Sequence, residues 1–320
     1  MSRSGHRLAT ACLAALAIAP ATATAQDDDT LTVILDWFVN PDHAPLIVAQ
    51  ENGYFAEEGL EVELIAPADP NDPPKLVAAG EADIAVTYQP NLHLQVDQGL
   101  PLTRIGTLVA TPLNSLVTLA DGPVEGLADL DGARIGYSVG GFEETLLEAM
   151  MADAGVDFGG IELVNVNWAL SGSLLAGRVD AVIGAFRNFE LNQLELEERP
   201  GRAFYPEEHG VPAYDELIYV ARNDALDDPR LVRFLAAVER GVIEVVNHPE
   251  ATLETFLATD PELDTPLNRM AWVDTLPRLA LAPAALDQGR YARFAAFLAE
   301  SGMIDPPPPV GTYAVDLGAE

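Results

Sequence analysis

Short apolar strands alternate with short helices along this chain from residue 31 onward. Strands are predicted at residues 31–35, 61–66, 82–87 and 134–139, and helices at 45–52, 74–79 and 142–154. Parallel strands need a crossover long enough to hold a helix, so this order predicts an α/β fold with parallel sheets. The length of 320 residues suffices for one large domain or two medium ones.

A repeated pattern indicates two similar lobes. Residues 76–86 read LVAAGEADIAV and residues 174–183 read LLAGRVDAVI. Each places Ala-Gly at a helix end, then an aspartate after two further residues, then an apolar strand. Residues 115–119 and 216–221 are predicted to cross between the lobes. The predicted boundaries are 31–116 plus 220–320 for the first lobe and 117–219 for the second.

Residues 1–25 have the pattern of a cleavable secretion signal. A basic start is followed by an apolar run over residues 8–18 and by the small residues Ala23-Thr24-Ala25. The run is shorter than the ~20 residues that a membrane span needs, which argues against a membrane anchor. A lipoprotein would have to use Cys12, the only cysteine, which lies inside the apolar run. Cleavage after Ala25 therefore predicts a soluble, cysteine-free protein in the periplasm, without disulfides or thiol chemistry.

The charge balance restricts the partners. The chain has 50 acidic and 17 basic residues and a net charge of −33. Repulsion between like charges argues against nucleic acid as a partner. The same excess suits a high-salt environment, where screening softens self-repulsion.

Four stretches resemble a known family. They are DWFVNPDHAPLIVAQENGYFAEEGLEVEL (36–64), DPPKLVAAGEADIAVTYQPNLHLQ (72–95), TPLNSLVTL (111–119) and DAVIGAFRNFELNQ (180–193). They are similar to the substrate-binding proteins of ABC transporters of the thiamine-pyrimidine type, which are related to thiamine pyrimidine synthases. The resemblance implies a type II periplasmic-binding-protein fold, two α/β lobes joined by two crossing strands. It also implies a monomer that carries an aminopyrimidine to a permease with ATPase subunits.

Ligand contacts are expected where strands end, because ligands of open α/β sheets lie beyond the carboxyl ends of the strands. Trp37 and Tyr88 are predicted to stack on a heterocycle, and Glu190 to bind a ring amino group. Polar contacts are assigned to Asn40, His43, Gln89, Ser115, Tyr137 and Asn188, and backbone amides that could hold an anion to Gly140 and Gly141. Each residue also has a structural interpretation: Trp37 in the core, Glu190 solvated, and His43 capping the next helix or packing against Asp36.

Two alternatives stay open. Nitrate- and sulfonate-binding relatives must neutralise an anion, and Arg187 is the only cation near the predicted strand ends. In the related synthases a lysine in the motif that matches PPKLVAAG forms a Schiff base with pyridoxal phosphate, and Lys75 stands at that place. The synthases also need a histidine shortly after it and a cysteine-rich iron motif, which the expected mature chain lacks. The histidines show no metal-ligand spacing, so a binding protein without metal or cofactor is expected.

Overall fold

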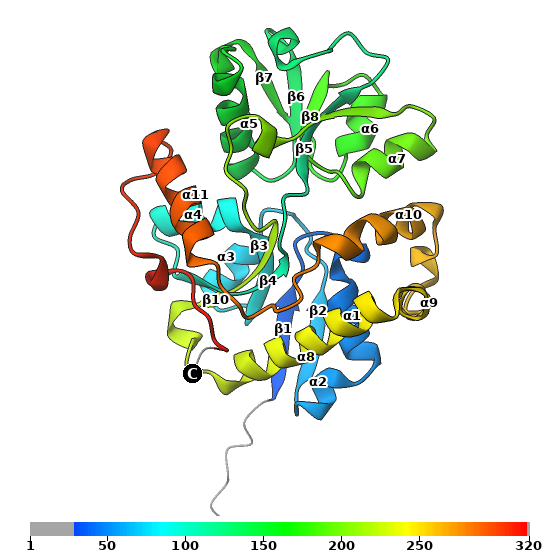
Figure 1. Ribbon diagram of the computed structural model, residues 1–320, viewed down its shortest axis with the longest axis vertical. Helices are drawn as coiled ribbons and strands as arrows, with labels where there is room; N and C mark the ends of the chain where they lie inside the picture. Colours follow the sequence, from blue (N-terminus) through cyan, green and yellow to red (C-terminus); the bar gives the residue numbers. More distant parts are fainter. Residues whose placement is uncertain (1–28, 319–320) are drawn as a thin grey trace, which may run out of the picture.

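The chain folds into two α/β lobes, one above the other in Figure 1. A computed structural model describes residues 29–318. The predicted secretion signal and Cys12 lie outside the described residues. No helix within residues 29–318 has both the length and the apolar character required to span a bilayer.

The sheet of the first lobe has the strand order β2-β1-β3-β10-β4. Its strands are β1 (Thr30–Ile34), β2 (Glu61–Ile65), β3 (Ile84–Tyr88), β4 (Leu102–Val109) and β10 (Leu217–Arg222). The first three strands are parallel, and β10 runs antiparallel between β3 and β4. The predicted strands at 31–35, 61–66 and 82–87 are confirmed to within two residues.

The sheet of the second lobe repeats this arrangement in the order β7-β6-β8-β5-β9. Its strands are β5 (Asn114–Leu119), β6 (Arg134–Tyr137), β7 (Glu162–Asn165), β8 (Ala181–Phe186) and β9 (Gly201–Phe204). Again three strands are parallel, and the fourth, β5, is antiparallel to both of its neighbours. Both lobes therefore use one topology, as the repeated pattern predicts.

Helices cover the faces of both sheets. The first lobe carries α1 (Ala44–Glu51), α2 (Tyr54–Glu57), α3 (Pro73–Ala79), α4 (Gln89–Asp97), α8 (Pro229–Asn247), α9 (Pro249–Ala258), α10 (Pro266–Thr275) and α11 (Gln288–Glu300). The second lobe carries α5 (Phe142–Asp153), α6 (Leu170–Leu175) and α7 (Glu190–Leu196). In α8, Gly241 lies so close to α1 that a Cβ atom there would sit 2.2 Å from the Pro45 carbonyl oxygen. Only glycine allows these two helices to pack at this distance.

The repeated Gly and Asp have the same roles in both lobes. Gly80 and Gly177 end α3 and α6 with φ of 76° and 65°, in the left-handed region that glycine adopts without strain. Asp83 donates its backbone amide to the Thr32 carbonyl at 3.1 Å and accepts the Thr32 amide on its carboxylate at 2.8 Å. Asp180 does the same with Arg134, whose amide it accepts at 2.9 Å. The aspartate thus fastens β3 to β1 in the first lobe and β8 to β6 in the second.

The chain changes lobe in the loops before β5 and β10 rather than in the strands themselves. Both strands pair along their length within one sheet, because a strand that left its sheet midway would leave backbone groups unpaired. The predicted crossings at 115–119 and 216–221 therefore correspond to lobe strands. We place the two crossing segments at residues 110–113 and 205–216 instead of at the predicted boundaries.

Candidate functional site

A narrow cleft lies between the lobes, at the carboxyl ends of β1, β3, β6 and β8. Acidic side chains line it from both lobes: Asp36, Asp42, Glu143 and Glu190. None of the described residues that line the cleft is a lysine or an arginine. The remaining lining residues are aromatic, small or polar: Trp37, Asn40, Tyr88, Ser138, Leu170, Gly184, Phe186 and Phe189.

The turn-rich segment after β1 places the first carboxylate. Asn40 caps a 3₁₀ turn (Pro41–His43), because its Oδ1 accepts the Asp42 amide at 2.8 Å. His43 accepts the Asn40 amide on Nδ1 at 3.3 Å. Its ring proton therefore lies on Nε2, which donates to Asp36 Oδ1 at 2.9 Å. His43 therefore packs against Asp36, as its structural interpretation predicts, and this hydrogen bond orients the Asp36 carboxylate.

Aromatic rings from both lobes form the walls. The Tyr88 hydroxyl donates to Asp36 Oδ2 at 3.0 Å, and one face of its ring stacks on Phe142 with centroids 4.6 Å apart. Trp37 meets Trp168 of the second lobe edge to face at 4.3 Å. Phe38, at the rim, lies 5.8 Å from Phe189. Aromatic rings from both lobes therefore border the cleft.

Burial raises the pKa of three acids of the cleft and so makes them reluctant to ionise. It raises the pKa of Glu190 to about 7, although the Phe186 amide donates to Glu190 Oε2 at 2.7 Å. It raises the pKa of Asp42 to about 6. Glu143 accepts the Ser138 amide at 2.8 Å, yet burial raises its pKa well above the ordinary value. Near neutral pH the site therefore offers both hydrogen-bond acceptors and carboxyl protons.

Gly184 makes room for one of these acids. A Cβ atom at Gly184 would lie 2.4 Å from Glu143 Oε1, and its φ of 92° already favours glycine. The position of the Glu143 carboxylate at the end of β8 thus depends on the absence of a side chain there.

Hydrogen bonds join the lobes on two sides of the cleft. On one side, Asn188 donates from Nδ2 to Asp42 Oδ1 and to the Thr275 hydroxyl, both at 2.7 Å. On the other, Asn71 in the loop before α3 accepts the Gly140 amide at 2.8 Å and donates to the Ser138 carbonyl at 3.2 Å. These contacts hold the cleft in a closed arrangement.

Four of the predicted ligand residues line the cleft: Trp37, Asn40, Tyr88 and Glu190. Three others point elsewhere. Gln89 turns toward the first lobe, where its Oε1 accepts the Asp215 amide at 2.8 Å. The Ser115 hydroxyl donates to the Ala185 carbonyl within the second sheet. Tyr137 packs against the hydrophobic core.

The remaining predicted polar groups are also engaged by the protein itself. Asn188 joins the lobes, as described. The Gly140 amide donates to Asn71, and the Gly141 amide donates to Glu144 at 2.6 Å. The predicted anion site is therefore filled by side chains of the chain. Arg187, the candidate cation for an anionic ligand, pairs instead with Glu207 at 2.6 Å.

Eight lining residues were not among the predicted ligand contacts, namely Asp36, Asp42, Ser138, Glu143, Leu170, Gly184, Phe186 and Phe189. Phe186 ends β8 and Phe189 lies in the turn after it, so the strand-end rule that predicts Glu190 applies to both equally. Glu143 gave no such signal, because an acid in the first turn of a helix is ordinarily a solvated residue that favours the helix dipole.

Comparison with known proteins places this chain in a family. The profile described as NMT1/THI5 like matches residues 40–252, more than half of the chain. The chain belongs to the NMT1/THI5-like family. A family relative from Haemophilus influenzae, named for thiamine biosynthesis, is 52% identical and covers 90% of this chain and 92% of its own. The formylaminopyrimidine-binding protein of Halalkalibacterium halodurans is 37% identical, covering 77% of this chain and 76% of its own.

Enzymes are among the relatives of this NMT1/THI5-like chain too. A 4-amino-5-hydroxymethyl-2-methylpyrimidine phosphate synthase of Legionella pneumophila is 28% identical and covers 82% of this chain and 85% of its own. Lys75, at the place of the synthases' lysine, lies on α3 outside the cleft lining, with its side chain 60% exposed and 3.7 Å from Asp72.

Solved structures show the fold of this NMT1/THI5-like chain. The alkanesulfonate-binding protein SsuA of Xanthomonas axonopodis aligns with a TM-score of 0.71 at 15% identity, over 90% of this chain and 99% of its own. A Candida albicans protein described as having the generic periplasmic binding protein fold aligns with a TM-score of 0.70 at 18% identity, over 90% and 96%. The predicted periplasmic-binding-protein fold is confirmed.

Proposed function

We propose that this chain is the extracytoplasmic solute-binding protein of an ABC importer and that it captures a thiamine-precursor aminopyrimidine. The observation that carries the proposal is the composition of the cleft, four carboxylates and four aromatic rings with no basic side chain among the described lining residues. A ligand for this site must be flat and rich in N–H donors. The name of the 37% identical relative, a formylaminopyrimidine-binding protein, agrees with that requirement.

An aminopyrimidine satisfies both groups of side chains. Its ring can pack against Trp37 and Tyr88, where an aromatic contact contributes about 0.5–1.5 kcal/mol per pair beyond area burial. A carboxyl group can bind an aminopyrimidine at two points, accepting from the amino group and donating to the ring nitrogen. Glu190 suits this pairing, because its pKa of about 7 keeps both of its protonation states populated near neutral pH.

The two alternative functions fit this chain less well. A sulfonate or nitrate would face four buried acids, while Arg187 and the Gly140 and Gly141 amides are bound to other groups. The interaction of a buried anion with like charges is strongly unfavourable. A synthase would need a lysine directed at its substrate, and Lys75 is exposed on the surface beside Asp72.

Export and delivery follow from the same proposal. The secretion signal predicted at residues 1–25 would bring the chain to the periplasm, where the closed, loaded form would dock on a permease with its ATPase subunits. Closure would be driven by contacts such as those of Asn71 and Asn188, which join the lobes.

Calorimetric titration tests the ligand assignment. Wild-type protein should bind 4-amino-5-hydroxymethyl-2-methylpyrimidine or its formylaminomethyl analogue, and should bind taurine and nitrate at least a hundredfold more weakly. The substitution W37A should weaken pyrimidine binding at least tenfold, about 1.4 kcal/mol, because it removes one wall of the cleft.

The matched control is Y54A, which removes an aromatic ring on α2 that contacts Arg240 far from the cleft. It should leave the affinity within twofold of wild type. Tight binding of taurine or nitrate, or a W37A variant with wild-type affinity, would overturn the assignment. Mass spectrometry of small molecules released from protein purified without refolding provides an independent identification.

A further inference from the structure

The two segments that cross between the lobes are each tied down at both ends by arginine side chains. We propose that Arg290 in the first lobe and Arg187 in the second are positioning residues for ligand binding. Each holds both crossing segments on its own lobe and thereby confines the bending of the hinge to the short stretch between them. The ligand part of the test rests on the proposed function, whereas the hinge part does not.

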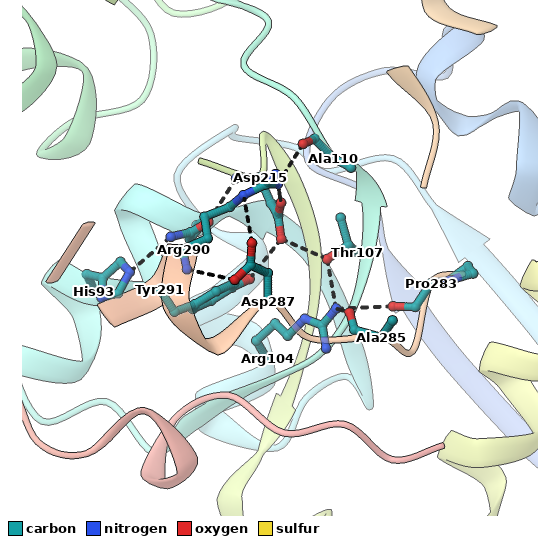
Figure 2. A network of polar contacts seen from close by, with 11 residues as sticks. His93, Arg104, Thr107, Ala110, Asp215, Pro283, Ala285, Asp287, Arg290 and Tyr291 are labelled. Atoms are coloured by element: carbon teal, nitrogen blue, oxygen red, sulfur yellow. Dashed lines mark hydrogen bonds and ion pairs between the residues drawn. The ribbon is translucent and has the colours of Figure 1, made fainter. Parts of the chain in front are cut away.

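Arg290 forms the tie on the first lobe, as Figure 2 shows. Its Nη1 donates to the Ala110 carbonyl at 2.7 Å, at the start of the first crossing segment. The same nitrogen pairs with the Asp215 carboxylate, near the end of the second. Asp215 also accepts the Thr107 hydroxyl at 3.0 Å, and its amide donates to Gln89. One guanidinium thus holds both crossing segments against the first sheet.

The helix that carries Arg290 is itself fixed. Asp287 caps the start of α11 by accepting the Arg290 amide at 2.9 Å. The segment before it is gripped by Arg104, which is fully buried and donates to the carbonyls of Pro283, Ala284 and Ala285 (Figure 2). Arg290 therefore projects from a rigid support, so its contacts constrain the hinge and not the helix.

Arg187, which follows β8, forms the corresponding tie on the second lobe. It donates to the carbonyls of Leu113 and Asn114 at 3.3 and 3.1 Å, at the end of the first crossing segment. It also binds Glu207 in the second crossing segment through two bonds of 2.6 and 3.0 Å. Its guanidinium lies 4.0 Å over the Tyr205 ring. Bidentate pairing and stacking both use the planar guanidinium, which a lysine cannot reproduce.

The stretches between the two ties are short. In the first crossing segment only Thr111 and Pro112 lie between the anchor at Ala110 and the anchor at Leu113. In the second segment the anchors at Glu207 and Asp215 leave residues 208–214. Glu216 links the two crossing segments, because its Oε2 accepts the amides of Leu113 and Asn114 at 2.5 and 2.9 Å. Hinges of this kind absorb lobe motion in a few backbone torsions.

The ties also connect the hinge to the cleft. Gln89, whose side chain holds the Asp215 amide, directly follows Tyr88 of the cleft wall. Asn114 Oδ1 accepts a hydrogen bond from the Gly184 amide at 3.1 Å, and Gly184 lies beside the carboxylate of Glu143. Loosening either tie should therefore lower the fraction of ligand-bound molecules in which the two lobes are closed on the ligand, and release becomes faster as that fraction falls.

The test of the first tie is the double variant D215N/R290Q. The single change R290Q would leave the Asp215 carboxylate, which is 5% exposed, without its partner and destabilise the fold. The double variant removes both charges. The test of the second tie is R187Q, whose partner Glu207 is partly exposed. The control is R293Q, on the same helix as Arg290, where Arg293 is exposed.

Stopped-flow kinetics with 4-amino-5-hydroxymethyl-2-methylpyrimidine should show release about tenfold faster in D215N/R290Q and in R187Q, with association rates within twofold of wild type. R293Q should match wild type in both rates. A merely structural role would lower the melting temperature of the variants and leave the release rate of the folded protein unchanged. Release rates within twofold of wild type would overturn the proposal.

A measurement without ligand keeps this outcome separate from that of the proposed function. Cysteines at the exposed positions Glu250 and Glu195, one on each lobe, can carry spin labels in a C12S background. Interlobe distances should be more broadly distributed in both hinge variants than in wild type and R293Q. Equal distributions would refute the ties even if the pyrimidine binds. If the wild-type protein does not bind the pyrimidine but the hinge variants have broader interlobe distance distributions than wild type, only the ligand assignment is refuted.

Discussion

At the scale of single residues, the buried acids of the cleft lower the stability of the folded protein as the pH rises, and Glu190 is the clearest case. Its pKa rises from 4.5 to about 7 on folding, chiefly because the carboxyl group is buried. The unfolded chain therefore releases this proton at lower pH than the folded protein. The contribution of Glu190 to stability is full below pH 4.5 and is lost as the pH rises to about 7.

The substitution E190Q should remove this fall in stability with rising pH. Glutamine can still accept the Phe186 amide that Glu190 accepts at 2.7 Å, but it carries no charge. We expect E190Q to be more stable than wild type at pH 8, by about 1–3 kcal/mol, and equal to it near pH 4. Urea unfolding at both pH values measures the difference.

The control for this comparison is E195Q, an exposed acid on the same helix, which should change stability little at either pH. An E190Q variant less stable than wild type at pH 8 would contradict a raised pKa for Glu190. The pyrimidine should nevertheless bind E190Q more weakly, because the neutral amide cannot supply the negative charge that pairs with a protonated ring nitrogen.

Residue types at strand ends predicted part of the site but not the direction of each side chain. Trp37, Tyr88 and Glu190 line the cleft as predicted, whereas Gln89 faces the hinge and Asn188 joins the lobes. An amide that ends a strand can serve either role, because the partner that decides is far away in the sequence. Asp215, which fixes Gln89, lies 126 residues from it.

At the scale of elements, the loop between β2 and α3 acts as a clasp on the second lobe. Asn71 binds Gly140 and Ser138 across the cleft, and Asp69 orients it by accepting both its amide and its Nδ2 at 2.9 Å. These bonds also lower the pKa of Asp69. We expect N71A to release ligand at least about fivefold faster, since the closed state loses two hydrogen bonds of about 0.5–1.5 kcal/mol each.

The isosteric change N71D separates hydrogen bonding from shape. An aspartate there would keep the acceptor for Gly140 but would face the carboxylate of Asp69 and the Ser138 carbonyl. We expect it to release ligand at least as fast as N71A, whereas N52D, an exposed change at the end of α1, should behave as wild type. Wild-type release in N71D would show that the loop acts by shape alone.

The order and kind of the elements were predictable because they depend on local pattern. Alternating apolar strands and glycine-ended helices gave β1, β2, β3, β6, α1, α3 and α5 to within two residues at nearly every end. The predicted lobe boundaries differ from those of the structure because the boundaries depend on strand pairing. A local sequence pattern does not reveal which strands pair. Residues 115–119 have the composition of any buried strand, and only their pairing with β8 and β9 assigns them to the second lobe.

At the scale of the whole molecule, the surface carries far more negative charge than its ion pairs can neutralise. Arginines such as Arg233, Arg240 and Arg269 each pair with surface acids. Exposed pairs of this kind contribute about 0–1 kcal/mol. The net charge of −33 leaves most acids without a basic neighbour, so their mutual repulsion opposes folding.

Salt should therefore stabilise this protein. The Debye length falls from about 10 Å at 0.1 M to about 3 Å at 1 M, which screens repulsion between exposed acids while it weakens the fewer ion pairs. We expect the melting temperature to rise by about 5 °C from 0.05 M to 2 M KCl, with most of the rise complete by about 0.5 M. Calorimetric melts across this range provide the measurement. Sodium sulfate is the comparison, because it strengthens apolar burial and should continue to raise the melting temperature beyond that point. A melt in 2 M KCl no higher than in dilute buffer would show that repulsion among the acids does not limit stability.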